Sequence, residues 1–339
     1  MVVSDLRVRW GRTPAGRSAK RSQHLDSAAM RALVTGGAGF IGSNLVDALL
    51  AQGHEVDVVD DLSSGKESNL TGALAAGARL HRADIREGEA IRDIVARVAP
   101  EVVFHLAAQI DVRLSVADPA YDARTNVEAT ANLLEAARAN GARRFVFAST
   151  GGAIYGETDV MPTPETTPPR PMAPYGTSKL CAEQYLGLYE RLHGMSTVAL
   201  RFGNVYGPRQ DPHGEAGVIA IFCGRLRRGE DLRVFGDGEQ TRDYIYVGDL
   251  VDAIATAGES DATGPINLGT EEETSVLRLA EILKRLSGSD AAIDFQPARL
   301  GEIERSVLDA SRARDLLGWT ARTRIEEGLR LTWEASASA

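Results

Sequence analysis

The sequence has few cysteines and no long apolar run, and each absence excludes a class of protein. Cys181 and Cys223 stand far apart among 339 residues, and neither lies in a spacing typical of zinc ligands. We therefore expect no disulfide framework and no metal site, and a reducing, cytoplasmic setting fits. No stretch of about 18 apolar residues occurs, so no membrane span is expected.

Positive charge is also scarce. Lys and Arg total 38 against 47 for Asp and Glu, which gives a formal net charge of -9. A chain this acidic has no general attraction for nucleic acid, although a local phosphate site is compatible with it. Residues 1–29 differ, because six of them are basic and two acidic. They lack the apolar run of a signal peptide, so we expect a disordered basic extension, with a targeting arm as the alternative.

The rest of the chain has the pattern of an α/β protein. Short, almost continuously apolar segments alternate with helical spacing, as in the predicted strand 31–35 and helix 40–51. Further strands are predicted at 55–59, 102–106 and 144–148. Such strands are typical of a doubly wound parallel sheet covered on both faces. We predict a Rossmann domain at 30–200 and a smaller α/β substrate domain at 201–335, with some strands interleaved into the first domain.

A glycine triplet follows the first predicted strand. Gly36, Gly39 and Gly42 recur at three-residue intervals where that strand turns into a helix. In this context glycines permit the tight turn, the approach of backbone N–H groups to a pyrophosphate, and close packing of helix on strand. Asp60 ends the second strand, where a carboxylate accepts hydrogen bonds from the adenosine ribose. Because Asp60 and Asp61 would repel a 2'-phosphate, NAD is favoured over NADP.

A phenol and an ammonium are spaced by one helical turn. Tyr175 and Lys179 are four residues apart in a predicted helix, so they share a face. They follow Ser149 and Thr150, hydroxyl residues at the carboxyl end of a strand, where doubly wound sheets bind ligands. A nearby ammonium, together with a positive nicotinamide ring, would lower the pKa of the phenol toward neutrality and make it a usable base.

Six segments carry a resemblance to a known family: TGGAGFIG, HLAAQ, STGGAIYG, YGTSK, NVYGPRQ and RDYIYV. In this order they resemble the extended short-chain dehydrogenase/reductase superfamily, and within it the bacterial UDP-glucose 4-epimerases. The resemblance runs from Met30 to about Trp333. It implies a Rossmann fold, bound NAD and a UDP-hexose substrate.

The resemblance also implies roles for individual residues. It assigns to NAD binding residues of the glycine turn, the following strand ends and the YxxxK helix: Gly36, Gly39, Phe40, Ile41, Gly42, Asp60, Ser64, Gly65, Asp84, Ile85, Leu106, Ala107, Ala108, Asn126, Tyr175 and Lys179. It assigns to substrate binding Gly151, Gly152, Asn204, Arg209, His213, Val218, Arg242, Arg299, Glu302 and Ser306. Planar arginine forks suit the phosphates, because they bind oxygens in pairs.

The sequence departs from the family at one place. Gly151 stands where the family usually has a catalytic Ser or Thr. We therefore expect Thr150 to hydrogen-bond the sugar O4, with Ser149 as the alternative, and a roomy pocket beside Gly151 and Gly152 in which the sugar turns. Related 4,6-dehydratases carry an adjacent Asp-Glu acid pair in this segment. Its absence here removes the proton donor for loss of water and excludes that reaction.

The implied reaction is reversible inversion at C4 of a UDP-hexose. Tyr175 takes the 4-hydroxyl proton, hydride passes to the nicotinamide, and the transient 4-keto sugar turns before hydride returns to its other face. Lys179 holds the cofactor ribose. UDP-glucose and UDP-galactose are the expected pair. UDP-glucuronate is an alternative through Arg209, although the nearby His213 is mostly neutral at pH 7. N-acetylated UDP-hexoses are another, because Ser306 is small.

Proteins of other classes fit less well. A non-catalytic NAD-binding regulator has no need for the intact Tyr175, Lys179 and Thr150. A Ser-His-Asp hydrolase lacks its GxSxG turn. The predicted helices around 119–139 and 175–193 resemble those that pair family members through a four-helix bundle, so a homodimer is expected.

Overall fold

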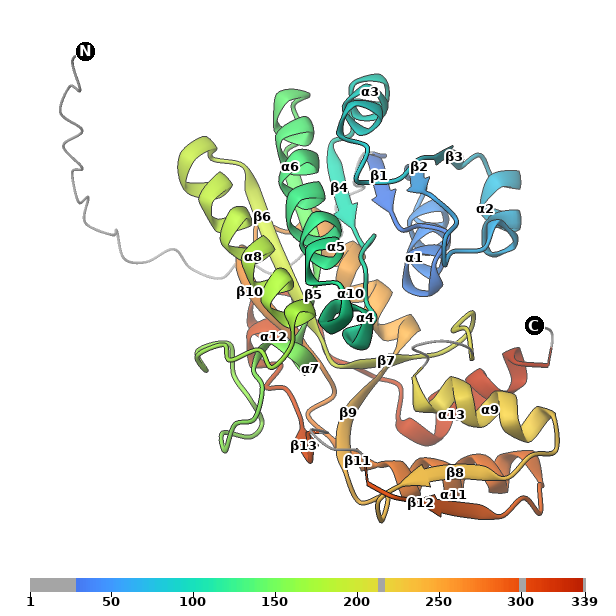
Figure 1. Cartoon of the computed structure of the whole chain (residues 1–339). Helices are drawn as coiled ribbons and strands as arrows, with labels where there is room; N and C mark the ends of the chain where they lie inside the picture. The colour runs from blue at the N-terminus through green and yellow to red at the C-terminus, as the bar shows by residue number, and fades with distance from the viewer. Residues whose placement is uncertain (1–28, 213–216, 299–302, 338–339) are drawn as a thin grey trace.

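A seven-stranded parallel sheet forms the centre of the larger part of the molecule (Figure 1). The structure, a computed structural model, describes residues 29–212, 217–298 and 303–337. The strand order is β10-β6-β5-β4-β1-β2-β3, which confirms the predicted doubly wound sheet. The strands are β1 (Arg31–Thr35), β2 (Glu55–Asp60), β3 (Arg79–Arg82), β4 (Val102–His105), β5 (Arg144–Thr150), β6 (Ser196–Phe202) and β10 (Gly264–Leu268).

The sheet separates two apolar cores. Along β1, Leu33 packs into one core, while its neighbours Ala32 and Val34 pack into the other. This alternation follows from the two-residue period of a strand. Both faces of the sheet are therefore covered, which explains why the strands are almost continuously apolar in the sequence. The carboxyl ends of β1, β4 and β5 lie at one edge, since Thr35 pairs with His105 and the register continues from His105 to Phe147.

Helices cover the two faces in separate sets (Figure 1). One core receives apolar side chains from α1 (Phe40–Ala51), α2 (Thr71–Ala75) and α10 (Val247–Glu259). The other core receives them from α3 (Gly88–Val98), α6 (Ala129–Ala139) and α8 (Pro174–His193). The predicted helix 40–51 is confirmed as α1. The stretch 119–139 divides into α5 (Pro119–Ala123), the π-helix η2 (Arg124–Glu128) and α6.

The second half of the chain builds smaller sheets below the large one (Figure 1). β9 (Thr241–Tyr246) pairs with β7 (Asn204–Tyr206), β11 (Glu273–Ser275) and β13 (Arg305–Ser306). β8 (Leu232–Phe235) pairs with β12 (Ile293–Gln296). A third apolar core joins this region to α9 (Val218–Arg227), α11 (Val276–Ser287) and α13 (Ile325–Ala335).

The chain crosses between the two regions more than once. β6 spans the predicted boundary at residue 200, and β10 and α10 return from the second half to the large sheet. The division into domains remains a prediction. Within the described residues, we find no helix whose length and hydropathy would let it cross a bilayer. The same residues contain no group of three or more His, Cys, Asp or Glu placed to hold a metal ion.

Candidate active site

The glycine turn between β1 and α1 is packed so closely that side chains at Gly36 and Gly42 would collide with backbone atoms. Gly36 has φ +69°, and its N–H donates to Val59 O at 2.8 Å. A Cβ on Gly36 would lie 2.7 Å from the Ala107 nitrogen, and one on Gly42 only 2.1 Å from Gly36 O. Gly39 caps α1 without a side-chain bond, so the first N–H groups of this 12-residue helix can bind an anion. The turn therefore fits a dinucleotide pyrophosphate.

Asp60, the last residue of β2, lies beside the glycine turn. Its two carboxylate oxygens accept backbone N–H groups from Ala38 and Leu62, both at 2.9 Å. Burial raises the pKa of Asp60, and these two donors oppose the rise. Each oxygen keeps a lone pair, so the side chain can also accept ribose hydroxyls.

A cavity runs along the carboxyl ends of the large sheet from Asp60 to Tyr175. The following residues predicted to bind NAD line it: Gly36, Gly39, Phe40, Ile41, Gly42, Asp60, Ser64, Asp84, Ile85, Leu106, Ala107, Ala108, Tyr175 and Lys179. Gly65 and Asn126 are placed behind this lining. A Cβ on Gly65 would lie 2.9 Å from Asp60 Oδ1, and Asn126 exchanges hydrogen bonds of 3.0 and 2.8 Å with the backbone of Gln109.

The cavity also contains residues that the sequence did not indicate. They include Arg86, Gln109, Ile110, Tyr121, Thr125 and Phe202. Arg86 pairs with Asp84 and stacks 4.8 Å from the Tyr121 ring centroid. Gln109 ends the HLAAQ segment, and the other five residues belong to no quoted motif. Arg86, Gln109 and Ile110 follow β3 or β4 at the edge where ligands bind, and that position could have indicated them. Tyr121 and Thr125 come from α5 and η2, and Phe202 ends β6.

Tyr175 and Lys179 line one end of this cavity together with Ser149, and Thr150 is the next residue along the chain. Lys179 Nζ donates to Ala148 O at 2.9 Å and lies 6.0 Å from the Tyr175 ring centroid. The Thr150 hydroxyl accepts a hydrogen bond from Ala153 N–H at 3.2 Å, and it lies close enough to the Tyr175 phenol to lower the pKa of that phenol. The helix α8 thus carries the phenol and ammonium to the carboxyl end of β5, as the four-residue spacing predicted.

The surroundings of Tyr175 and Lys179 shift the pKa of both side chains. Burial, with the nearby Asp122 carboxylate, raises the pKa of Tyr175 to about 12. Burial lowers the pKa of Lys179 to about 8. In the protein alone, Lys179 is not among the groups that shift the pKa of the phenol, and its ammonium is bonded to Ala148 O. The predicted lowering also depends on bound NAD, so it stays a prediction. The positive nicotinamide ring of bound NAD is the remaining source of that effect.

Ser149 and Thr150 have separate partners. Ser149 Oγ donates to Glu183 Oε1 at 2.6 Å. Glu183 forms a buried ion pair with Arg201 at 2.6 Å, and Arg201 also donates to the Tyr155 hydroxyl at 2.8 Å. Ser149 lines the cavity, but its hydroxyl is engaged in this buried network. Thr150 instead acts on the Tyr175 phenol. This arrangement favours Thr150 over Ser149 for contact with the sugar.

The space beside Gly151 is filled. Gly151 is buried, and a Cβ there would lie 2.5 Å from the Leu308 side chain. The roomy pocket predicted at Gly151 is therefore wrong, because Leu308 occupies it. Gly152 is half-buried, and a Cβ on it would meet only Asn204 Oδ1, at 3.7 Å. The structure thus brings Gly152 and Asn204 together on the substrate side.

The other predicted substrate residues are dispersed over the second half. Arg242 of β9 and Ser306 of β13 are partners in register, so they are neighbours. Val218 is the first residue of α9. Arg209 donates to Asp47 of α1 at 2.6 Å. His213, Arg299 and Glu302 lie outside the described residues.

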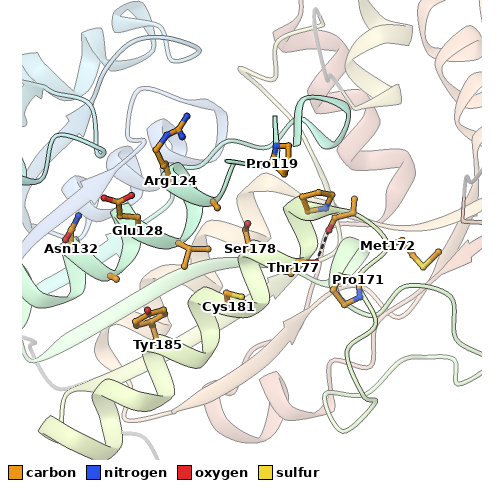
Figure 2. Close-up of a pocket in the computed structure, with 15 residues that line it drawn as sticks. Pro119, Arg124, Glu128, Asn132, Pro171, Met172, Thr177, Ser178, Cys181 and Tyr185 are labelled. Carbon is orange, nitrogen blue, oxygen red and sulfur yellow. Dashed lines mark hydrogen bonds between the residues drawn. The ribbon is translucent and has the colours of Figure 1, made fainter. Parts of the chain in front are cut away.

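A second hollow lies on the outer surface of α8 (Figure 2). One wall comes from α5, η2 and α6, and the other from α8 and the segment before it. Arg124 and Glu128 lie on the first wall and Cys181 and Tyr185 on the second. Met172 at its rim is 74% exposed. No predicted catalytic residue lines this groove, so it is distinct from the dinucleotide cavity.

Comparisons with known proteins agree with this geometry. Residues 32–269 match the NAD dependent epimerase/dehydratase family. A UDP-glucose 4-epimerase of Mycolicibacterium smegmatis is 47% identical over 90% of this chain and 98% of its own. The structure of a Thermotoga maritima UDP-glucose 4-epimerase with UDP-glucose has a TM-score of 0.88 and 47% identity, covering 91% of this chain and 99% of that one. A Thermus thermophilus UDP-glucose 4-epimerase in complex with NAD has a TM-score of 0.85 and 43% identity, covering 91% and 100%.

The family match covers more than half of the chain, and the fold and glycine turn agree with it. The resemblance to the extended short-chain dehydrogenases/reductases is thereby confirmed. The chain belongs to the NAD dependent epimerase/dehydratase family.

Proposed function

We propose that this protein is an NAD-dependent 4-epimerase that interconverts UDP-glucose and UDP-galactose through a transient 4-keto sugar. The observation that carries the proposal is that Tyr175 and Lys179 line one end of a cavity whose other walls fit a dinucleotide, with Thr150 close enough to act on the Tyr175 phenol. The relatives described above, 43–47% identical over most of the chain, support the same reaction.

Separate residues of the chain act on the sugar and bind the cofactor. Tyr175 accepts the proton of the 4-hydroxyl, and Thr150, which is close enough to the phenol to lower its pKa, orients that hydroxyl. Lys179 contributes a positive charge beside the phenol. The glycine turn and Asp60 hold the cofactor. When bound, NAD would accept hydride from C4 and return it to the opposite face of the sugar.

The surroundings of Arg209 bear on the choice of substrate. UDP-glucuronate needs a cation for its carboxylate, and the guanidinium of Arg209 is already paired with Asp47. This pairing disfavours the uronate. Ser306, beside Arg242, remains small enough to leave N-acetylated UDP-hexoses as a second candidate class.

Incubation of the purified protein with UDP-galactose, UDP-galacturonate and UDP-N-acetylgalactosamine in turn tests the proposal. We expect UDP-glucose to form fastest, measured by chromatography, and Tyr175→Phe to lower that rate by at least about 100-fold. The relative rates rank the substrates. If NAD is bound but none of the three sugars is converted, the epimerase proposal fails and a non-catalytic NAD-binding regulator becomes the better description.

We also propose that the protein forms a homodimer through the groove on α8. Its rim exposes Met172 and Tyr185, and it holds one residue of each charge, Arg124 and Glu128 (Figure 2). A two-fold interface pairs a patch with itself, so a mixed-charge patch suits it. Light scattering should give twice the chain mass, and Tyr185→Glu should give a monomer. A wild-type monomer would contradict the dimer.

A cytoplasmic location is part of the proposal. Both cysteines are free, with Cys181 exposed and Cys223 buried. Free thiols are typical of a reducing compartment. No nucleic-acid partner is proposed, because the net charge of -9 gives no general attraction for nucleic acid.

A further inference from the structure

One segment of the chain connects the two ends of the dinucleotide cavity. It begins after Phe202, which lines the cavity and pairs in register with Thr150 at the catalytic end. It continues through β7, passes below α1 (Figure 1) and reaches Asp211, whose carboxylate pairs with Lys66 at 2.8 Å. Lys66 lies in the loop after β2, at the opposite, ribose end of the cavity. We call residues 203–211 the strap.

The strap is bound to α1 at two further points. Asn44 Nδ2 donates to Pro208 O of the strap at 3.2 Å and also to Phe40 O at 2.8 Å. Since Phe40 lines the cavity, this one amide connects the cavity wall to the strap. Arg209 of the strap donates to Asp47 of α1 at 2.6 Å. The strap thus holds the helix whose first turn faces the pyrophosphate site.

Lys66 is connected to the ribose end of the cavity through its backbone. Its N–H donates to Ala38 O at 3.0 Å, and the Ala38 N–H donates to Asp60 Oδ2 at 2.9 Å. Gly65, the preceding residue, packs against the same carboxylate, because a Cβ there would lie 2.9 Å from Asp60 Oδ1. A contact that holds Lys66 therefore also holds the surroundings of Asp60.

The backbone of the strap has a conformation that its contacts must maintain. Arg209 has φ +72°, in the left-handed region that only glycine adopts at little cost. Gly207 has φ +146°, and a Cβ on it would lie 2.5 Å from the Val247 side chain. Gln210 braces the turn, since its N–H donates to Gly207 O at 3.3 Å and its Nε2 to Val205 O at 3.1 Å. Strained backbone of this kind is typical of ligand clamps.

We propose that the strap, fastened by the ion pair of Lys66 and Asp211, slows the release of NAD, so that both are positioning residues for the cofactor. This inference rests on the proposed function, because inversion through a 4-keto sugar requires the reduced cofactor to stay bound until hydride returns. The strap braces the first turn of α1 and the loop beside Asp60, the parts of the wall that fit the pyrophosphate and the ribose. A wall held in place opens less often, so the dinucleotide leaves more slowly.

The exposure of the ion pair determines the size of the expected effect. The Lys66 side chain is 58% exposed and that of Asp211 is 39% exposed. Because water competes for both charges, such a pair adds little to the free energy of unfolding. We therefore expect its loss to speed NAD release about three- to fivefold and to leave the unfolding transition nearly unchanged.

NAD release from the loaded protein tests this role without any turnover. Protein loaded with radiolabelled NAD would be diluted into excess unlabelled NAD, and the label retained on a filter would be followed with time. Asp211→Ala should release NAD about three- to fivefold faster than wild type. If Lys66 acted only by attracting the phosphates, removal of the Asp211 carboxylate would strengthen that attraction and slow the release. Release from Asp211→Ala that is unchanged or slower overturns the proposal.

Two further variants separate the strap from general loosening. Lys66→Ala with Asp211→Ala should release NAD no faster than the faster single variant, because the two changes remove one contact; multiplied effects would contradict the pair. Arg278→Ala breaks an exposed ion pair of 3.1 Å with Glu326, between α11 and α13, and should leave the release unchanged. An equal acceleration in Arg278→Ala would overturn the proposal.

The release rates decide the role of the strap separately from the reaction. A wild type that loses its NAD during the dilution itself would contradict retention by the strap. If wild type retains NAD but converts no UDP-hexose, the proposed function fails, while the comparison of Asp211→Ala with wild type still decides whether the strap holds the cofactor.

Discussion

Leu308 occupies the space that a side chain at Gly151 would need. A Cβ on Gly151 would lie 2.5 Å from Leu308 Cδ1, and Leu308 is almost fully buried. Its backbone N–H donates to the buried carboxylate of Asp243 at 3.2 Å, which keeps it in place. The family usually has a hydroxyl residue at position 151. Here Leu308 explains why the position is glycine, and Thr150, close to the Tyr175 phenol, becomes the hydroxyl available to the sugar.

Gly151→Ser should therefore lower the free energy of unfolding, even though it restores the hydroxyl residue that is usual in the family. The new side chain has to displace Leu308, and overpacking a core costs about 1–3 kcal/mol of unfolding free energy. Leu308→Ala in the same chain should recover part of that loss, as measured by denaturant unfolding. Gly152→Ser is the matched control, because its Cβ would meet only Asn204 Oδ1 at 3.7 Å. Equal stability of Gly151→Ser and Gly152→Ser would contradict the steric account.

The glycine turn should tolerate no methyl group at Gly42. A Cβ there would lie 2.1 Å from Gly36 O, a backbone atom that cannot move away without opening the turn. We expect Gly42→Ala to weaken NAD binding by at least about 100-fold, measured by isothermal titration with the stripped protein. Gly72→Ala, in α2 with open space around it, should bind NAD normally. Normal NAD affinity in Gly42→Ala would show that the cofactor does not depend on this turn.

The ion pair between Arg209 and Asp47 should limit the use of uronates. Wild type is expected to convert UDP-galacturonate at least about tenfold more slowly than UDP-galactose, because the guanidinium is occupied. Asp47→Ala frees Arg209 and should raise the uronate rate several-fold. The double variant with Arg209→Ala should lose that gain. Comparable rates on both sugars in wild type would contradict this prediction.

His105 should make the protein sensitive to acid. It is buried between Thr35 and Thr130, with ring nitrogen to hydroxyl distances of 2.7 and 2.9 Å, and burial lowers its pKa from 6.5 to about 3. Between these two values the unfolded chain binds a proton that the folded chain does not. The stabilising contribution is thus complete above about pH 6.5 and is lost as the pH falls toward 3.

The melting temperature should accordingly fall between pH 6.5 and 4. His105→Gln should make this decrease in melting temperature smaller, while His193→Gln, at an exposed position, should leave it unchanged. An unchanged pH dependence in His105→Gln would show that other groups control the acid sensitivity.

The sequence predicts well those structural elements that depend only on residues near one another in the chain. The turn Gly36–Gly42, the helix α1 and the strand ending at Thr150 follow from glycine spacing and apolar period, and the structure has them where they were expected. Tyr175 and Lys179 meet because four residues make one helical turn. The NAD-binding wall, too, follows from strand ends that share one edge of the sheet.

The parts that the sequence did not predict depend on contacts between distant segments. Nothing near Gly151 indicates that Leu308 fills its pocket, and nothing near Arg209 indicates Asp47. The pKa of Tyr175 depends on burial and on Asp122, neither of which the YxxxK spacing contains. Such pairings follow from the completed fold and not from any one motif.

The fate of the hydrogen at C4 shows whether the sugar is inverted by transient oxidation within one active site. UDP-galactose carrying deuterium at C4 would be incubated with the NAD-loaded enzyme and a pool of unlabelled free NAD. The account predicts UDP-glucose that retains the deuterium at C4, with none in water and none in free NADH, because the hydride is removed and returned within one active site. Deuterium in the solvent or in released NADH would contradict inversion by transient oxidation with a retained cofactor.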